Sequence, residues 1–132
     1  MVRFVRIPTY EQFDKMIDKT VKENGKNIYV LLFGTEDPST GSSWCPDCVI
    51  ADPLIRRHFS NEAHPESVLV EVPVGTRSQY KGRPDNPYRT HPRIQLKAIP
   101  TLIKWSANGS DDKSLVEDEC SRDDMLKKFF SE

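Results

Sequence analysis

The chain has 132 residues, of which 36% are hydrophobic and 30% charged, a composition typical of a soluble domain large enough to form its own core. Its 19 basic and 20 acidic residues give a formal net charge of −1, which excludes an overall field that would recruit nucleic acid or an anionic membrane. The apolar runs end after about six residues, too few for a helix that crosses a bilayer. We therefore expect one domain over residues 1–132, with no nucleic-acid or membrane partner.

The N-terminal segments predict a strand followed by an amphipathic helix. Residues 2–7 alternate weakly and suit a short edge strand. Thr9 and Gln12 form a capping-box pattern at the start of the helix, and Asn24-Gly25 supplies a C-terminal stop. The predicted apolar face of this helix holds Tyr10, Phe13, Ile17 and Val21.

An unbroken apolar run at residues 28–33 predicts a strand buried on both faces, hence at the centre of a sheet. The polar loop 34–43 follows it. A helix then begins near Pro46, because proline suits the first helical turn, where its missing N–H would have no partner. We expect this helix to bend at Pro53 and to end in a turn at 61–65.

The middle of the chain combines one clear strand with a segment of weak pattern. Residues 67–72 have a strong strand composition. From 75 to 96 the apolar signal fades, and a short helix is expected only near 85–91. Within 77–93, basic residues are frequent, which suits either attraction of an acidic partner or a solvated loop.

The C-terminal part predicts a strand hairpin and a last helix. Residues 99–105 and 113–117 are the two strands, with a turn signal at 108–109. Ser121 and Asp124 form a capping-box pattern before the helix. Its predicted apolar side holds Met125, Leu126, Phe129 and Phe130.

This order of elements predicts an α/β fold. The alternation of strands and helices in the first half implies parallel strands joined by right-handed crossovers, and the hairpin adds antiparallel strands. We expect a mixed sheet of about five strands with helices on both faces.

The chemistry of the chain is concentrated in Trp44-Cys45-Pro46-Asp47-Cys48. Two thiols separated by two residues at the start of a helix can close a small disulfide ring reversibly. The helix N-terminus favours the thiolate of Cys45, which lowers its pKa from about 8.5 toward about 6–7, whereas Asp47 opposes this effect. We expect Cys45 to be the exposed nucleophile and Cys48 the more buried resolving thiol, with Trp44 either flanking the site or serving as ordinary packing.

Other uses of the cysteines are less well supported by their spacing. A zinc site needs further soft ligands, and no second ligand pair is formed by Cys120, His58, His64 and His91. We therefore expect no metal, and a structural role for Cys120 as a buried thiol. The first residues lack the apolar region of a signal peptide, so a reducing cytoplasm is the expected compartment.

The motifs together resemble the thioredoxin fold and, more closely, the 14-kDa thioredoxin-related proteins (the thioredoxin domain-containing protein 17 family). The resemblance is carried by Trp-Cys-Pro-Asp-Cys after the extended loop 34–43, by Ile99-Pro100-Thr101 opening a later strand, and by residues 115–120, Leu-Val-Glu-Asp-Glu-Cys. It covers essentially the whole chain.

The resemblance implies a monomeric cytosolic disulfide reductase that is recharged by thioredoxin reductase with electrons from NADPH and holds no bound cofactor. It implies substrates that are small disulfides such as cystine or selected disulfide-containing proteins, and a place in peroxidase-linked antioxidant defence. It also implies a cis peptide bond at Pro100. Ile99, Pro100 and Thr101 would contact the substrate.

Two departures from general thioredoxins bear on the chemistry. Pro46-Asp47 stands between the cysteines in place of Gly-Pro, and residues 30–33 lack the buried acid that serves the resolving thiol. Asp47 is either a replacement proton acceptor for Cys48 or a first-turn acid that favours the helix dipole. The alternative to a reductase is a thioredoxin-fold binding or redox-sensing module with little turnover.

Overall fold

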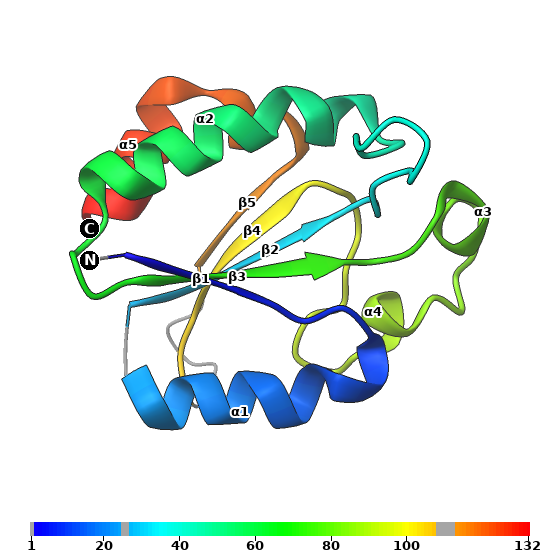
Figure 1. Cartoon of the computed structure of the whole chain (residues 1–132), viewed down its shortest axis with the longest axis horizontal. Coiled ribbons are helices and arrows are strands. Elements are labelled where there is room, and N and C mark those ends of the chain that lie inside the picture. The colour runs from blue at the N-terminus through cyan, green and yellow to red at the C-terminus, as the bar shows by residue number, and fades with distance from the viewer. Residues whose placement is uncertain (1, 25–26, 108–112) are drawn as a thin grey trace.

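The computed structural model describes residues 2–24, 27–107 and 113–132. Its strands are β1 (Arg3–Arg6), β2 (Ile28–Phe33), β3 (Val68–Pro73), β4 (Thr101–Trp105) and β5 (Lys113–Val116). Within the described residues they form one five-stranded sheet in the order β1-β3-β2-β4-β5 (Figure 1). β3 pairs in parallel with β1 and β2, whereas β4 pairs antiparallel with β2 and β5. The predicted mixed sheet is therefore confirmed.

The central position of β2 follows from its composition. All six of its residues are buried, because β3 and β4 flank it and helices cover both of its faces. β1 lies at the edge of the sheet and is largely exposed, as the weak alternation of residues 2–7 predicts. The carboxyl end of β2 thus delivers the chain directly to the loop that precedes the two cysteines.

Helices cover the two faces of the sheet in separate layers. α2 (Pro46–Glu62) and α5 (Asp123–Ser131) lie on one face, and α1 (Phe13–Asn24) lies on the other with the short α4 (Pro87–Thr90) (Figure 1). α3 (Arg77–Tyr80) lies at the end of the sheet where α2 begins. Among the described residues, no helix is both long and apolar enough to cross a membrane.

The two predicted capping boxes are wrong in detail. The Thr9 hydroxyl donates to the Gln12 side chain at 2.8 Å instead of capping the backbone, because a 3-10 turn η1 (Tyr10–Gln12) precedes α1. The Ser121 hydroxyl donates to the Asp118 carbonyl at 3.0 Å, since a second 3-10 turn η2 (Glu117–Ser121) intervenes and Arg122 becomes the cap residue of α5. Both helices nevertheless pack through their predicted apolar faces.

The predicted element ends agree only in part with the structure. α2 continues through Pro53, as expected, but it ends at Glu62, inside the predicted turn of 61–65. The helix expected near 85–91 is present as α4, whereas α3 was not predicted. The predicted helix stop at Gly25 and the hairpin turn at 108–109 lie outside the described residues.

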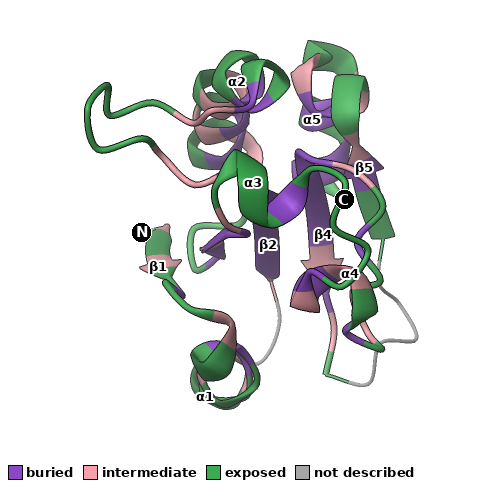
Figure 2. Cartoon of the chain, turned by 90° about the vertical axis from the view of Figure 1, so that its right-hand side faces the viewer, coloured by how far each residue is buried: buried purple, intermediate pink, exposed green. Residues whose placement is uncertain are grey.

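Aromatic rings form the core between the sheet and the α2–α5 layer. The rings of Tyr29 and Phe130 are 4.9 Å apart, and those of Phe59 and Phe130 are 5.5 Å apart. Figure 2 shows that the central strands β2 and β4 and the inward sides of these helices are buried while the outer helix faces are exposed. The packing fixes α2, and with it the first turn that carries the cysteines.

His58 joins α2 to α5 through charged hydrogen bonds. Its Nε2 lies 2.8 Å from Asp123 and its Nδ1 lies 2.7 Å from Glu62, and the ring is buried. The hydrogen bond with Asp123 raises the pKa of His58 against the opposing effect of burial, and Glu62 raises it further. The same bond, with Arg57 in support, lowers the pKa of Asp123. The protonated imidazole therefore stabilises the contact between these helices.

We expect His58→Gln to lower the free energy of unfolding most strongly at mildly acidic pH. Because the folded state raises the pKa of His58, its contribution is fully present below the unfolded value of about 6.5 and is lost as the pH rises through the folded value. Urea unfolding at pH 5.5 and pH 8.5 measures this difference, with the exposed His64→Gln as the control. An equal loss at both pH values would contradict the charged pairing.

Candidate active site

The two cysteines lie at the N-terminus of α2, as predicted. Cys45 is the N-cap residue, and its Sγ accepts a hydrogen bond from the backbone N–H of Cys48 at 3.3 Å. Pro46 occupies the first helical turn, where the missing N–H has no consequence. The helix end thus presents one of its unpaired N–H groups to a sulfur atom that can carry negative charge.

The burial of Cys45 corrects one expectation. Only 6% of Cys45 is exposed, against 4% of Cys48, so the first cysteine is not the exposed thiol that its position in the sequence predicts. The reason is its capping role, which turns the sulfur toward the first turn of the helix instead of toward solvent. A substrate must therefore approach Cys45 closely, or the sulfur must turn outward, before exchange can begin.

The electrostatic environment shifts the pKa values of the two thiols in opposite directions. A hydrogen bond from the Cys48 thiol, with a further contribution from the Cys48 backbone N–H, lowers the pKa of Cys45 to about 7 against the opposing effects of burial and of the Asp47 charge. The same bond and burial raise the pKa of Cys48 strongly. Near neutral pH, Cys45 is the sulfur that ionises, and Cys48 keeps its proton.

Trp44 braces the loop that leads to the cysteines. Its Nε1 donates a hydrogen bond to the Gly75 carbonyl at 2.8 Å, which ties the loop to the segment after β3. A Cβ atom at Gly34 would lie 2.7 Å from the indole ring, so only glycine allows this close approach. The indole ring also packs against Tyr80 of α3, with 6.2 Å between the ring centroids. These contacts show the packing role, and a role beside the substrate stays a prediction.

The segment Ile99-Pro100-Thr101 is buried at the start of β4 and contains the cis peptide bond before Pro100 that the resemblance implies. The Pro100 carbonyl accepts a hydrogen bond from the Glu117 N–H at 2.7 Å, and the Thr101 hydroxyl donates to the Ala98 carbonyl at 2.6 Å. Among the described residues, no hydrogen bond to the backbone of Ile99 is recorded. Pairing of that backbone with an extended substrate segment stays a prediction.

A cavity of about 260 Å³ lies beside the second cysteine. Cys48 and Pro100 both line it, although Pro100 lies far from Cys48 in the sequence. Loop 34–43 contributes Glu36 from its first half and residues 41–43 from its second half. α2 contributes both buried residues, such as Ile55, and the partly exposed Arg56. Of the predicted site residues, Cys48 and Pro100 thus meet the long loop in this cavity, whereas Cys45 is not among its lining residues.

Comparison with known proteins identifies the family. The family model described as thioredoxin domain-containing protein 17-like, thioredoxin domain, matches residues 6–132. Thioredoxin domain-containing protein 17 of Mus musculus is 36% identical over 129 residues, which are 97% of this chain and 94% of that protein. The chain belongs to the thioredoxin domain-containing protein 17-like family.

Two further similarities carry less information: one covers only part of each protein, and the other shows the fold alone. An acireductone dioxygenase of Leishmania infantum is 42% identical over 80 residues, which are 58% of this chain but only 23% of that longer protein. The solved structure of Fasciola hepatica thioredoxin covers 99% of this chain and 97% of its own chain with a TM-score of 0.59 at 16% identity, which shows the thioredoxin fold. Family and fold together support a redox-type protein of the thioredoxin fold.

In this family member, apolar residues fill the part of β2 where general thioredoxins carry a buried acid. Leu31 and Leu32 of β2 are at most 2% exposed, so no carboxylate reaches Cys48 from the strand. Asp47 is exposed in the first turn of α2, and among the described residues its carboxylate accepts no hydrogen bond from the Cys48 thiol. The geometry matches the first-turn acid, and a role of Asp47 as proton acceptor for Cys48 stays a prediction.

Asp47→Asn is expected to lower the pKa of Cys45 by about half a unit, because the Asp47 charge opposes formation of the thiolate. The absorbance of the thiolate near 240 nm, followed against pH, measures this value. Asp52→Asn is the control, since Asp52 lies further along the same helix and pairs with Arg56. A pKa of Cys45 that is unchanged or higher in Asp47→Asn would contradict the electrostatic effect.

The positive charge of the basic segment 77–93 is less available to an acidic partner than the composition of the segment indicates. Arg83 pairs with Asp85, and the Arg89 guanidinium lies over the Tyr80 ring at 3.9 Å from its centroid. Arg93 lies over Trp105 at 3.8 Å, and His91 bonds Asp14 at 2.8 Å. The structure thus uses much of this positive charge internally, which favours the solvated-loop interpretation over recruitment of an acidic partner.

Cys120 supports the segment that contains Pro100. It is fully buried, and its thiol lies 3.4 Å from the Leu115 carbonyl and 3.7 Å from the Pro100 carbonyl. Burial raises the pKa of Cys120 to about 12, so this thiol stays protonated at neutral pH. In the described part of the chain, no group of three or more His, Cys, Asp or Glu side chains is arranged to hold a metal ion.

Proposed function

We propose that this chain is a cytoplasmic dithiol–disulfide oxidoreductase that reduces disulfides through Cys45 and Cys48. One observation carries the proposal. Two neighbouring thiols have pKa values shifted in opposite directions, so one sulfur is poised as a nucleophile while the other retains its proton. Paired groups whose environments separate their pKa values are the usual mark of divided chemical roles.

The proposed reaction has two exchange steps. The Cys45 thiolate attacks one sulfur of the substrate disulfide, the Cys45–substrate bond forms, and the other substrate sulfur leaves as a thiolate that takes a proton from solvent. Cys48 then loses its proton and attacks Cys45, which releases the second substrate thiol and closes the Cys45–Cys48 disulfide. Thioredoxin reductase would return the two electrons from NADPH, and no cofactor is required on this chain.

A redox-sensing or binding module with little turnover is the second candidate. It is favoured by the burial of both sulfur atoms, since an inaccessible dithiol would exchange slowly. A coupled assay distinguishes the two candidates. With thioredoxin reductase and cystine, a reductase consumes NADPH repeatedly, whereas a sensor stops after one equivalent of disulfide.

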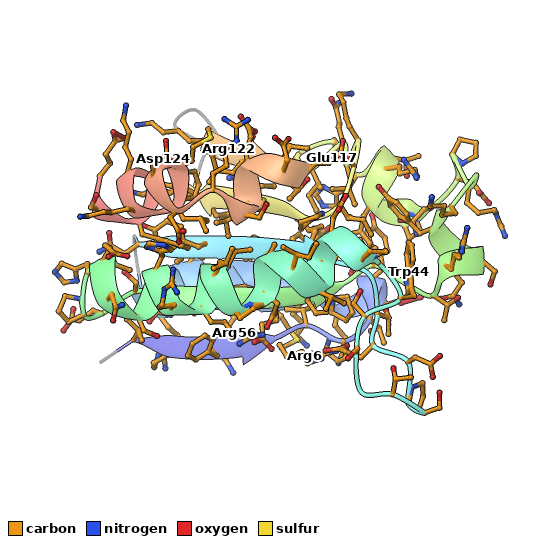
Figure 3. The ribbon with its side chains drawn as sticks, turned by 90° about the horizontal axis from the view of Figure 1, so that it is seen from above. Arg6, Trp44, Arg56, Glu117, Arg122 and Asp124 are labelled. Carbon is orange, nitrogen blue, oxygen red and sulfur yellow. The ribbon has the colours of Figure 1, made fainter. Side chains whose placement is uncertain are left out.

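Loop 34–43 is proposed to select substrates by size. An isolated antiparallel β-bridge between Glu36 and Ser43 closes the loop. Glu36 also forms a 2.7 Å ion pair with Arg6. Arg6 and Arg56 both pair with Glu71, which connects the base of the loop to β3 and α2 (Figure 3). The ion pairs fix the base of the loop, whose two ends, Glu36 and residues 41–43, line the cavity beside Cys48.

We expect turnover of cystine to exceed reduction of insulin, because the fixed loop obstructs a folded substrate more than a small one. NADPH consumption in the coupled assay measures both rates. A variant that joins residues 36 and 43 by a short turn should raise the insulin rate by several fold while leaving the cystine rate nearly unchanged. If the native chain reduces insulin as fast as a general thioredoxin does, the loop is not a filter.

A further inference from the structure

A cleft of about 640 Å³ lies between loop 34–43 and the segment that contains α3, at the end of the sheet where α2 begins (Figure 1). The exchange reaction described above does not use it. Trp44 lines this cleft, together with residues 35–38 of the loop, residues 76–78 and Lys81. Its volume is typical of small-molecule sites, which span about 300–1,000 Å³. We call it the Trp44 cleft.

The acidic side chains of the Trp44 cleft already have partners within the protein. Glu36 forms a 2.7 Å ion pair with Arg6. Asp37 accepts hydrogen bonds from the backbone N–H of Ser39 at 2.8 Å and from its hydroxyl at 2.7 Å. Both carboxylates are thus engaged by groups of the chain itself.

The basic side chains of the cleft, Arg77 and Lys81, have no such partners. Both are exposed, and among the described residues neither side chain forms an ion pair or a hydrogen bond. They are four residues apart, so one helical turn brings them to the same side of α3. The other arginines of segment 77–93 have partners, as described above. The segment thus presents its two available cations in this cleft, where they suit the carboxylates of a small ligand.

We propose that the Trp44 cleft binds the carboxylates of short acidic peptide disulfides, such as glutathione disulfide, through Arg77 and Lys81. Both side chains form charge-assisted hydrogen bonds with carboxylates. Cys45 does not line the cleft but directly follows Trp44. A peptide whose carboxylates are several bonds away from its sulfur can therefore occupy the cleft while the sulfur meets Cys45. The inference rests on the proposed function, leaves its exchange steps unchanged and names a substrate class for them.

Binding is measured with S-methylglutathione, which keeps both carboxylates but has neither a disulfide nor a free thiol. In an NMR titration, the indole N–H signal of Trp44 reports occupancy of the cleft. Trp105 provides an internal reference, because it is buried and does not line the cleft.

The test variant carries Arg77→Gln and Lys81→Gln together. The control carries Lys15→Gln and Lys22→Gln, which change the net charge equally on exposed positions of α1, outside the cleft. The test variant should bind about five- to tenfold more weakly than the native chain, and the control should match the native chain. Added salt should weaken native binding. Equal affinities in the test variant and the control, or equal affinities of the native chain for S-methylglutathione and its dimethyl ester, would overturn the inference.

Single-turnover oxidation of the reduced protein separates this inference from the proposed function. Glutathione disulfide should oxidise the test variant about five- to tenfold more slowly than the native chain. Hydroxyethyl disulfide, which is uncharged, should oxidise both equally, whereas an altered pKa of Cys45 would change both rates. Equal rates with glutathione disulfide would overturn the substrate role of the cleft. If neither probe forms the Cys45–Cys48 disulfide, the proposed function is overturned, and the titration still decides whether the cleft binds carboxylates.

Discussion

Replacing Cys45 by serine is expected to abolish disulfide reduction, with a loss on the order of a thousandfold or more, because a serine hydroxyl does not ionise near neutral pH. Cys48→Ser should also stop turnover, but at a later stage. In that variant the Cys45 thiolate still attacks the substrate, and no second thiol releases it. A covalent adduct on Cys45 should therefore accumulate, and mass spectrometry of the intact protein detects it.

Cys120→Ser is the control for this pair of variants, since its buried thiol faces the Pro100 and Leu115 carbonyls instead of the cavity beside Cys48. It should keep the ability to reduce disulfides, and it should not accumulate an adduct. Adducts that form in Cys45→Ser and not in Cys48→Ser would reverse the assigned roles. Such a result would also contradict the opposite pKa shifts of the two thiols.

Phe130→Ala is expected to lower the free energy of unfolding by about 3–5 kcal/mol, the usual cost of truncating a buried aromatic side chain. Phe130 is 2% exposed, and its ring contacts Tyr29 of β2 and Phe59 of α2. The truncation leaves a cavity between the sheet and the helix that carries the cysteines. Urea denaturation of the reduced protein measures the change.

Ile50→Ala is the matched control, because Ile50 lies on α2 but is 58% exposed. Its truncation removes apolar atoms that already contact water, so the expected loss is below about 0.5 kcal/mol. Comparable losses in the two variants would contradict the view that the ring cluster between α2, α5 and β2 is the main apolar contact of this layer.

The parts of the fold that sequence predicts well are those dominated by local pattern. The six apolar residues of β2 indicate a strand covered on both faces, and the structure places it at the centre of the sheet. The position of Cys45 at the start of a helix follows from Pro46 and from the helical spacing beyond it. These features depend on the backbone and on side chains close in sequence, so they require no knowledge of tertiary contacts.

The remaining features depend on contacts between distant segments. The burial of Cys45 results from its turn toward the Cys48 N–H, and the association of Cys120 with Pro100 needs the pairing of β4 with β5. Tyr80 carries no sequence signal, because α3 is short and polar apart from its last residue. 3-10 turns before α1 and α5 replace the predicted capping boxes. The Thr9 and Ser121 hydroxyls donate to acceptors other than those of a capping box.

The most direct test of dithiol exchange is the covalent state of the chain after a single turnover. The reduced protein is mixed with one equivalent of cystine without any reductase, quenched with an alkylating reagent and digested for mass spectrometry. The account predicts a disulfide between Cys45 and Cys48, two equivalents of released cysteine, and alkylation at Cys120 alone once the protein is unfolded. Recovery of all three cysteines as alkylated thiols, or of a disulfide that includes Cys120, would contradict it.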